Sequence, residues 1–179
     1  MDTRGLSFSQ SEDPARESMS KAARARYDEI VLATRALYEE KGLSNTSVQD
    51  ITQKVGVTRS LFYHYFRDKE AVTNAVLDTY ISDYLEAVEI WNQQRQVGEI
   101  EDALSSAVKL LRVVLFENDS FRIALASKEN AELYLEFLNR VADRIARYIV
   151  DSTVVDYAIY HTVAIDHVYE TFYVLIIGL

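Results

Sequence analysis

The 179-residue sequence contains no cysteine, one proline and five glycines, and each scarcity excludes a class of structure. Without cysteine there is no disulfide framework and no thiolate chemistry, which suits a reducing compartment. With so few helix-breaking residues, the chain lacks the regularly spaced turn signals of an all-β protein. We therefore expect an all-α protein, long enough for one large domain or for a small domain fused to a medium one.

Long apolar runs are also missing. The longest, FYVLIIGL at residues 172–179, is far shorter than the roughly 20 residues that span a bilayer. Residues 1–21 are polar and charged where a signal peptide needs an apolar stretch, and they show no periodicity, so we interpret them as a flexible tail. We expect a soluble, cytoplasmic protein that makes no membrane contact.

Positive charge is scarce in total, because the formal net charge is −9, but its distribution is uneven. Residues 16–69 hold ten Lys and Arg against seven Asp and Glu, whereas residues 71–179 hold eight against seventeen. The acidity therefore belongs to the C-terminal part of the chain. The N-terminal part has an excess of positive charge and can therefore still bind the phosphates of a nucleic acid.

Hydrophobic periodicity predicts a first helix from about residue 22, with Gly42 as a left-handed stop. A short second helix follows, with Thr46 as its N-cap, Gln49 completing a capping box, and an end at Gly56. A third helix, capped by Thr58, begins only a few residues later. Two short helices joined by a tight turn that contains glycine form the outline of a helix-turn-helix.

The rest of the chain is predicted to be helical as well. A long fourth helix begins after Asp68, which caps it, and runs to Gly98. Asp151 to Thr153 are expected to restart the chain into a last helix that is still apolar at Leu179. Between these two helices the pattern predicts three others, over about 99–116, 120–127 and 131–150.

Five aromatic side chains occupy consecutive positions from Phe62 to Phe66, within the stretch GVTRSLFYHYFRDKEA. At about 100° per residue, Phe62 and Phe66 share one face of the third helix, which we expect to pack on the first two helices. The opposite side carries the polar groups of Ser60, Tyr63, His64 and Arg67, with Arg59 at its N-terminal edge.

Hydroxyl, imidazole and guanidinium groups on that side can bind phosphates, and the small Ser60 allows the helix to approach base edges closely. These features favour a surface that binds duplex DNA. The alternative is an aromatic helix that is packed on both sides in a larger bundle.

Residues 30–72 resemble the DNA-binding domain of the TetR family of bacterial transcriptional regulators. The resemblance rests on the order and spacing of IVLATRALYEEKG, TSVQDITQKVGV and TRSLFYHYFRDKEAV. It implies a helix-turn-helix DNA-binding domain over residues 22–72, after the tail of residues 1–21, and a helical effector-binding and dimerisation domain over residues 73–179. It also implies a homodimer that binds double-stranded DNA at a palindromic operator, by default as a repressor controlled by a small-molecule effector.

The resemblance further assigns roles to single residues. Base contacts are implied for Arg59 and Ser60. Leu61 departs from the small hydroxyl residue common at its position, and it either contacts a thymine methyl or fills a gap; Arg67 replaces a frequent proline. Phosphate contacts are implied for Thr46, Ser47, Thr58, Tyr63 and Lys69.

The C-terminal hundred residues carry no motif of comparable specificity. Their aromatic side chains supply enough surface to line a mostly apolar effector cavity, and each of them is alternatively simple core. The candidates are Tyr80, Tyr84, Trp91, Phe116, Phe121, Tyr134 and Phe137.

Residues 153–179 are apolar on nearly every side, and a helix of that kind must be buried on more than one face. We therefore expect a homodimer. In the resembling family two C-terminal helices of each subunit form a four-helix bundle at the dimer interface. Here only one full helix fits before Leu179. We therefore expect either that a natural final helix is missing from the sequence or that a shortened bundle forms the interface. The predicted interface centres on Val155, Ile159, Val163, His167 and Phe172.

Catalytic and metal-binding patterns are absent from the sequence. His161 and His167 are six residues apart, which is not the spacing of a helical metal pair, and there is no phosphate-binding glycine loop or nucleophile elbow. We expect no enzymatic activity, no cofactor and no metal. The competing hypothesis is a helical adaptor or small-molecule carrier that has kept the fold without regulating transcription. Loss of the polar surface residues over positions 58–69 would favour this hypothesis. The sequence retains those residues.

Overall fold

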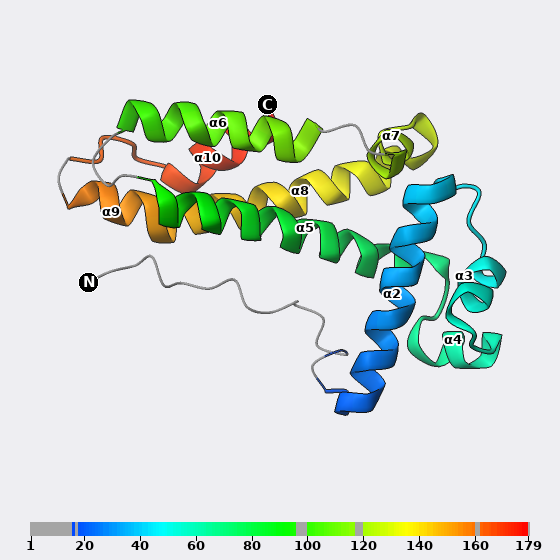
Figure 1. Ribbon diagram of the computed structural model, residues 1–179. Coiled ribbons are helices and arrows are strands. Elements are labelled where there is room, and N and C mark those ends of the chain that lie inside the picture. Colours follow the sequence, from blue (N-terminus) through cyan, green and yellow to red (C-terminus); the bar gives the residue numbers. More distant parts are fainter. Residues whose placement is uncertain (1–15, 17, 96–99, 117–119, 160–161, 179) are drawn as a thin grey trace. The chain divides into compact units, whose positions relative to one another are not determined.

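The computed structural model describes residues 16, 18–95, 100–116, 120–159 and 162–178 (Figure 1). Every regular element in these ranges is a helix, which confirms the expected all-α class. None of the described helices combines the length and apolarity needed to cross a bilayer. The elements are α2 (Lys21–Lys41), α3 (Val48–Val55), α4 (Arg59–Tyr65), α5 (Lys69–Gln94), α6 (Ile100–Phe116), α7 (Ser120–Leu125), the 3-10 turn η2 (Lys128–Asn130), α8 (Ala131–Tyr148), the π-helical segment η3 (Ile149–Val154), α9 (Val155–Ala158) and α10 (Val168–Ile177).

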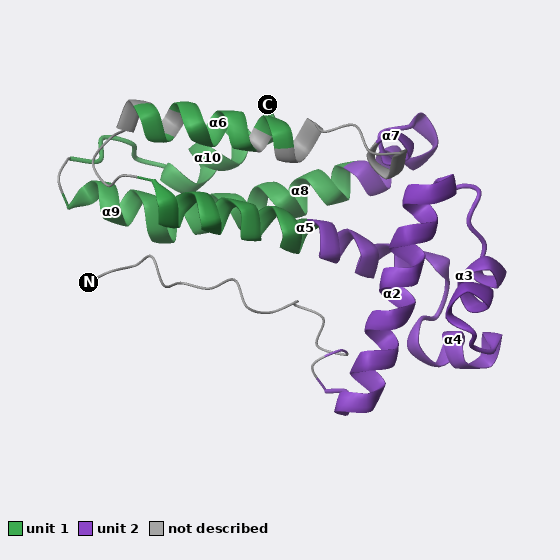
Figure 2. Ribbon diagram, viewed as in Figure 1, with its two compact units in different colours: residues 1–9, 81–117, 135–179 green, residues 10–80, 118–134 purple. Residues whose placement is uncertain are grey.

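The chain divides into two compact units (Figure 2). The head unit contains, among the described residues, 16, 18–80 and 120–134; the bundle unit contains 81–95, 100–116, 135–159 and 162–178. Helix α5 contributes residues to both units. A compact unit is not by itself a functional domain, so the domain boundary at residue 72 stays a prediction.

Local capping signals set most helix boundaries in the head unit. Helix α2 ends at Gly42, whose φ of 85° confirms the glycine stop, although its ψ of 161° is not that of a left-handed helix. Helix α3 ends at Gly56 in the left-handed conformation (φ 75°, ψ 34°) that glycine adopts without strain. Thr58 caps α4 by accepting a hydrogen bond from Leu61 N at 3.2 Å, as predicted. Asp68 caps α5 through Ala71 N at 2.8 Å, also as predicted.

The predicted cap of the second helix is wrong by one residue. Ser47, not Thr46, is the N-cap of α3, and the capping box is completed by Asp50 rather than Gln49. Thr46 is only 2% exposed, and its hydroxyl donates to the carbonyl of Gly42 at 2.8 Å. Because this side chain is committed to the preceding turn, the next residue is the first one able to cap the helix.

The core of the head unit holds the aromatic face of α4. Phe62 and Phe66 are buried, and their ring centroids lie 5.6 Å apart. Tyr27 of α2 packs on Phe66 with a centroid distance of 4.7 Å. Tyr63, by contrast, is 52% exposed. The prediction that α4 buries one aromatic face is therefore confirmed, and packing on both sides is excluded within the head unit.

The bundle unit departs from the prediction near residue 150. The chain does not restart at Asp151 to Thr153: α8 passes through the π-helical segment into α9 without a break. The Ser152 hydroxyl donates to the carbonyl of Tyr148 at 2.6 Å, so polar side chains are accommodated inside the helical run.

The expected single helix from residue 153 onward is also wrong, because α9 ends at Ala158 and α10 begins only at Val168. The sequence between these two helices contains no glycine or proline that would predict the interruption. The predicted end of the fourth helix at Gly98 lies outside the described residues.

Candidate nucleic-acid interface and ligand cavity

The solvent-facing side of α4 carries the polar groups that the sequence placed there. Ser60, Tyr63 and His64 are exposed, and Leu61 is half-buried. The Tyr63 ring packs edge-on against Phe62 at 5.4 Å between centroids, and the ring of His64 meets Tyr65 in the same way at 5.1 Å. Each exposed ring is thus supported from within the head unit.

Arg59, the first residue of α4, contacts α3. Its Nη2 donates a hydrogen bond to Oε1 of Gln49 at 3.1 Å, and both side chains are exposed. A guanidinium has five N–H donors, so this bond leaves others available for recognition of a base or a phosphate. Sequence reasoning used Gln49 only as a capping residue and missed this contact, because the two residues are ten positions apart and belong to different helices.

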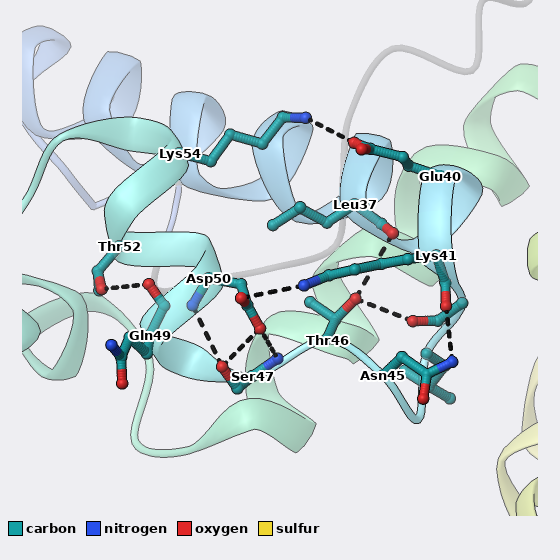
Figure 3. Close-up of polar contacts among 12 residues, drawn as sticks. Leu37, Glu40, Lys41, Asn45, Thr46, Ser47, Gln49, Asp50, Thr52 and Lys54 are labelled. Carbon is teal, nitrogen blue, oxygen red and sulfur yellow. Dashed lines mark hydrogen bonds and ion pairs between the residues drawn. The ribbon is translucent and has the colours of Figure 1, made fainter.

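A charged network surrounds the start of α3 (Figure 3). Asp50 accepts hydrogen bonds from the Ser47 hydroxyl at 2.6 Å and from its backbone N–H at 2.7 Å, and it pairs with Lys41 of α2 at 3.0 Å. These interactions, led by the Ser47 hydroxyl, hold the pKa of Asp50 below its ordinary value. The network joins α2 to α3 and leaves Ser47 exposed at the N-terminus of the helix.

Thr46 lies on the inner side of this network. Figure 3 shows its side chain directed at backbone oxygens of the preceding turn, including the carbonyl of Leu37 at 3.5 Å. Its burial gives the hydroxyl little access to a phosphate. Ser47, one residue later, has that access.

Lys69 begins α5 and reaches back to the loop between α2 and α3. Its Nζ donates to the carbonyl of Leu43 at 2.6 Å and lies 5.9 Å from the ring centroid of Tyr38. Burial lowers the pKa of Lys69, and the charge of Asp50 opposes this effect. An ammonium has three donors, and a phosphate beside it would favour the charged form.

The candidate pocket aromatics are not brought together. Tyr80 lies in the head unit, where its hydroxyl donates to Glu39 at 2.7 Å, and Tyr134 lies in that unit too. Tyr84 and Phe137 are buried against each other in the bundle unit, at 6.0 Å between ring centroids. The side chains of Phe116 and Phe121 lie outside what the structure describes.

The seventh aromatic, Trp91, lines a cavity of about 480 Å³ in the bundle unit. The wall is almost entirely apolar, and it includes Val163 and Phe172, which the sequence assigned to a dimer interface. Its residues come from α5, α6, the segment from Ile149 to Tyr157, residues 162–165 and α10. They are Trp91, Arg95, Ala103, Ala107, Ile149, Thr153, Val154, Tyr157, Thr162, Val163, Ala164, Ile165, Val168, Thr171, Phe172 and Leu175.

Three of the five interface candidates are exposed, namely Val155, Ile159 and His167. Other large apolar side chains near them are exposed as well: Ile165, Val174, Leu175 and Ile177. His161 lies outside the described residues, and among those described no group of three or more His, Asp or Glu is placed to hold a metal ion.

Comparison with known proteins matches the part of the chain that contains the first of these two candidate sites. Residues 30–76 match the family model described as bacterial regulatory proteins, tetR family. This range begins in α2, contains all of α3 and α4, and ends in the first part of α5.

Two curated relatives each match less than half of the chain. YvdT of Bacillus subtilis (strain 168), an uncharacterised HTH-type transcriptional regulator, is 31% identical over 70 residues, which cover 39% of this chain and 36% of that protein. The transposon Tn10 TetC protein of Escherichia coli is 28% identical over 83 residues, 42% of each chain. The match thus spans well under half the length of each relative.

A crystal structure of a putative transcriptional regulator (TetR/AcrR family member) covers 86% of this chain and 85% of its own, with a TM-score of 0.50 and 24% identity. At this identity the likeness shows the fold alone. It extends the agreement in helical architecture beyond the head unit.

Proposed function

Because the chain belongs to the TetR family of bacterial regulatory proteins, we propose that it binds double-stranded DNA and regulates transcription. The observation that carries this proposal is the exposed polar side of α4, whose other side is held by buried Phe62 and Phe66. A helix supported in this way can present its exposed polar side to a major groove.

Base readout is proposed for the N-terminal part of α4. Arg59 can address a guanine through paired N–H donors, and Ser60 is small enough to let the helix approach base edges. Leu61 is half-buried beside them, and a contact with a thymine methyl is proposed for it.

Phosphate contacts are proposed for groups that surround α4. Ser47 is the N-cap of α3 and Thr58 is the N-cap of α4, so each position combines a hydroxyl group with a helix N-terminus, and both can bind a phosphate. Tyr63, His64 and Lys69 add a phenol, an imidazole and an ammonium group. Thr46 contributes indirectly, because its buried hydroxyl bonds fix the turn that presents Ser47.

We further propose that the protein acts as a homodimer on a near-palindromic operator, as a repressor that responds to a small-molecule effector. The exposed apolar residues of α9 and α10 support the dimer, since apolar surface of this kind seldom stays exposed in a monomer. The cavity in the bundle unit supports the effector. An effector shifts DNA affinity only if it binds one conformation better than the other.

Selection of genomic DNA fragments by the purified chain, followed by gel-shift titration, tests DNA binding. We expect an enriched near-palindrome whose half-sites lie about 34–36 Å apart. The double variant Arg59→Ala, Tyr63→Ala should lose the enrichment, whereas Gln53→Ala, at another exposed position of the head unit, should keep it. A folded chain that enriches nothing would replace this proposal with the small-molecule carrier hypothesis.

Sedimentation at micromolar concentration tests the homodimer. Ile159→Asp should convert the dimer to monomer, because Ile159 is 59% exposed in the parent chain and a buried interfacial carboxylate is costly. Ile123→Asp is the matched control, at a position that is 62% exposed in α7 of the head unit. A parent chain that sediments as a monomer would refute this part of the proposal.

A further inference from the structure

We infer that the cavity of the bundle unit selects an uncharged apolar molecule and discriminates against anions, because the cation in its wall is already neutralised by its own neighbour. The inference rests on the proposed effector role of this unit and specifies the chemistry of the ligand. Among the described residues that line the cavity, Arg95 alone carries a formal charge at neutral pH.

Arg95 is held by a buried polar cluster. Its Nη2 pairs with Asp156 Oδ2 at 2.8 Å, and the two side chains are each 6% exposed. Its Nε donates to Oδ1 of Asn92 at 2.7 Å. Asn92 also donates from Nδ2 to the Tyr148 hydroxyl at 3.0 Å and accepts from the Thr153 hydroxyl at 3.2 Å. An incoming anion would have to compete with Asp156 for a guanidinium whose charge is already neutralised.

Two further polar side chains of the wall, Trp91 and Thr171, are also engaged in hydrogen bonds. Trp91 donates from Nε1 to the Ser106 hydroxyl at 2.9 Å, and that hydroxyl donates to the carbonyl of Ala103 at 3.0 Å. The Thr171 hydroxyl donates to the carbonyl of His167 at 2.7 Å. A polar ligand group beside these side chains would lose its water without gaining an equivalent partner, which is unfavourable, and for an ion strongly so.

Size and lining point to the same class of ligand. The volume of about 480 Å³ lies within the range of about 300–1,000 Å³ typical of small-molecule sites. Apolar side chains from four helical elements form most of the surface, and burial of apolar ligand surface against them is favourable. The occupant is therefore a compact hydrophobic molecule without a formal charge.

The test compares two fluorescent probes that share an arylaminonaphthalene skeleton, neutral N-phenyl-1-naphthylamine and its sulfonated analogue 8-anilino-1-naphthalenesulfonate. Trp91 is the only tryptophan of the chain and lies in the cavity wall, so its emission reports binding. We expect the neutral probe to quench Trp91 and to bind at least tenfold more tightly than the sulfonate. Equal or tighter binding of the sulfonate would overturn the inference.

A filled cavity provides the positional control. Ala107→Phe, in the wall contributed by α6, should weaken binding of the neutral probe at least tenfold, whereas Ser105→Phe, exposed on the same helix, should not. Unchanged binding in Ala107→Phe would show that the probe sits elsewhere and would overturn the inference. DNA binding without probe is measured separately by gel shift, so failure of the ligand class is distinguishable from failure of the proposed regulatory function.

Asp156→Asn tests the role of the ion pair directly. With its partner neutralised, Arg95 becomes an uncompensated cation in the wall, and the sulfonate should gain at least tenfold relative to the neutral probe. A variant that keeps its helical circular dichroism and the parent's probe ratio contradicts the role of the pair. If the variant does not fold, the parent probe ratio and Ala107→Phe still decide the question.

Discussion

Gln49 Oε1 accepts a hydrogen bond from Arg59 Nη2 over 3.1 Å, so the first residue of α4 is joined to the first turn of α3. A planar guanidinium that is held along one edge has less rotational freedom and presents its remaining donors in a restricted direction. In the proposed DNA complex, Gln49 is therefore a positioning residue for the base-reading arginine.

Gln49→Ala should lower the discrimination between the operator and a variant changed at the base pair that Arg59 contacts, by about threefold to tenfold, in line with the loss of one hydrogen bond. The salt dependence of binding should stay unchanged, because no phosphate contact is lost. Fluorescence anisotropy with both DNA duplexes measures this ratio. Gln53→Ala serves as the control, and equal discrimination in Gln49→Ala and Gln53→Ala would contradict the positioning role.

Lys69→Ala should weaken binding to every DNA sequence and reduce the slope of log affinity against log salt by about one unit. Its hydrogen bond to the Leu43 carbonyl is lost at the same time, so thermal unfolding must be recorded to confirm that the head unit is folded. Lys54, exposed and paired with Glu40 at 3.3 Å, supplies the control Lys54→Ala. The phosphate role is wrong if the Lys69→Ala slope equals that of the parent.

Acid should destabilise the parent more steeply than it destabilises Asp50→Asn. The pKa of Asp50 in the folded chain lies below its ordinary value of 3.8, so the unfolded chain takes up the proton first as pH falls. The contribution of Asp50 is therefore fully present above pH 3.8 and is lost below it, as pH approaches the lowered pKa.

Urea unfolding of both proteins at neutral pH and at several acidic pH values measures this difference. Ser47→Ala should flatten the same dependence, because the Ser47 hydroxyl is the main cause of the lowered pKa. Parallel pH profiles of the parent and Asp50→Asn would rule out the linkage.

Phe62→Ala and Tyr63→Ala should separate stability from DNA binding. Phe62 is fully buried, so its truncation should cost about 3–5 kcal/mol of unfolding free energy. Tyr63 is largely exposed, so its truncation should leave stability within about 0.5 kcal/mol and weaken DNA binding instead. Urea titration and gel shift on the same preparations give both quantities, and a Tyr63→Ala variant with parental DNA affinity would disprove its phosphate role.

The head unit was largely predictable from the sequence because its signals are local. The spacing of Phe62 and Phe66 gave the buried face of α4, and Thr58 and Asp68 gave the starts of α4 and α5. Thr46 failed as a cap because its burial against the preceding turn is a tertiary effect. Residue type alone does not distinguish it from Ser47.

The bundle unit was less predictable because its determinants are distant in sequence. Arg95 and Asp156 meet across 61 positions, and no local pattern connects them. The composition showed that aromatic side chains are present, but it did not predict which of them line the cavity. Trp91 lines it, whereas Tyr84 and Phe137 pack on each other. The interruption between α9 and α10 has no glycine or proline to mark it.

The π-helical segment from Ile149 to Val154 acts on the helical run as an inserted residue, because a π turn holds about one residue more than an α turn. One extra residue shifts the angular phase of everything after it by about 100°. Val155 and Ile159 consequently leave the apolar stripe of α8 and face solvent, while Asp156 turns inward to Arg95. Deleting one residue of the segment would allow a regular α-helix without changing the phase of the residues after it, so Asp156 would still face Arg95.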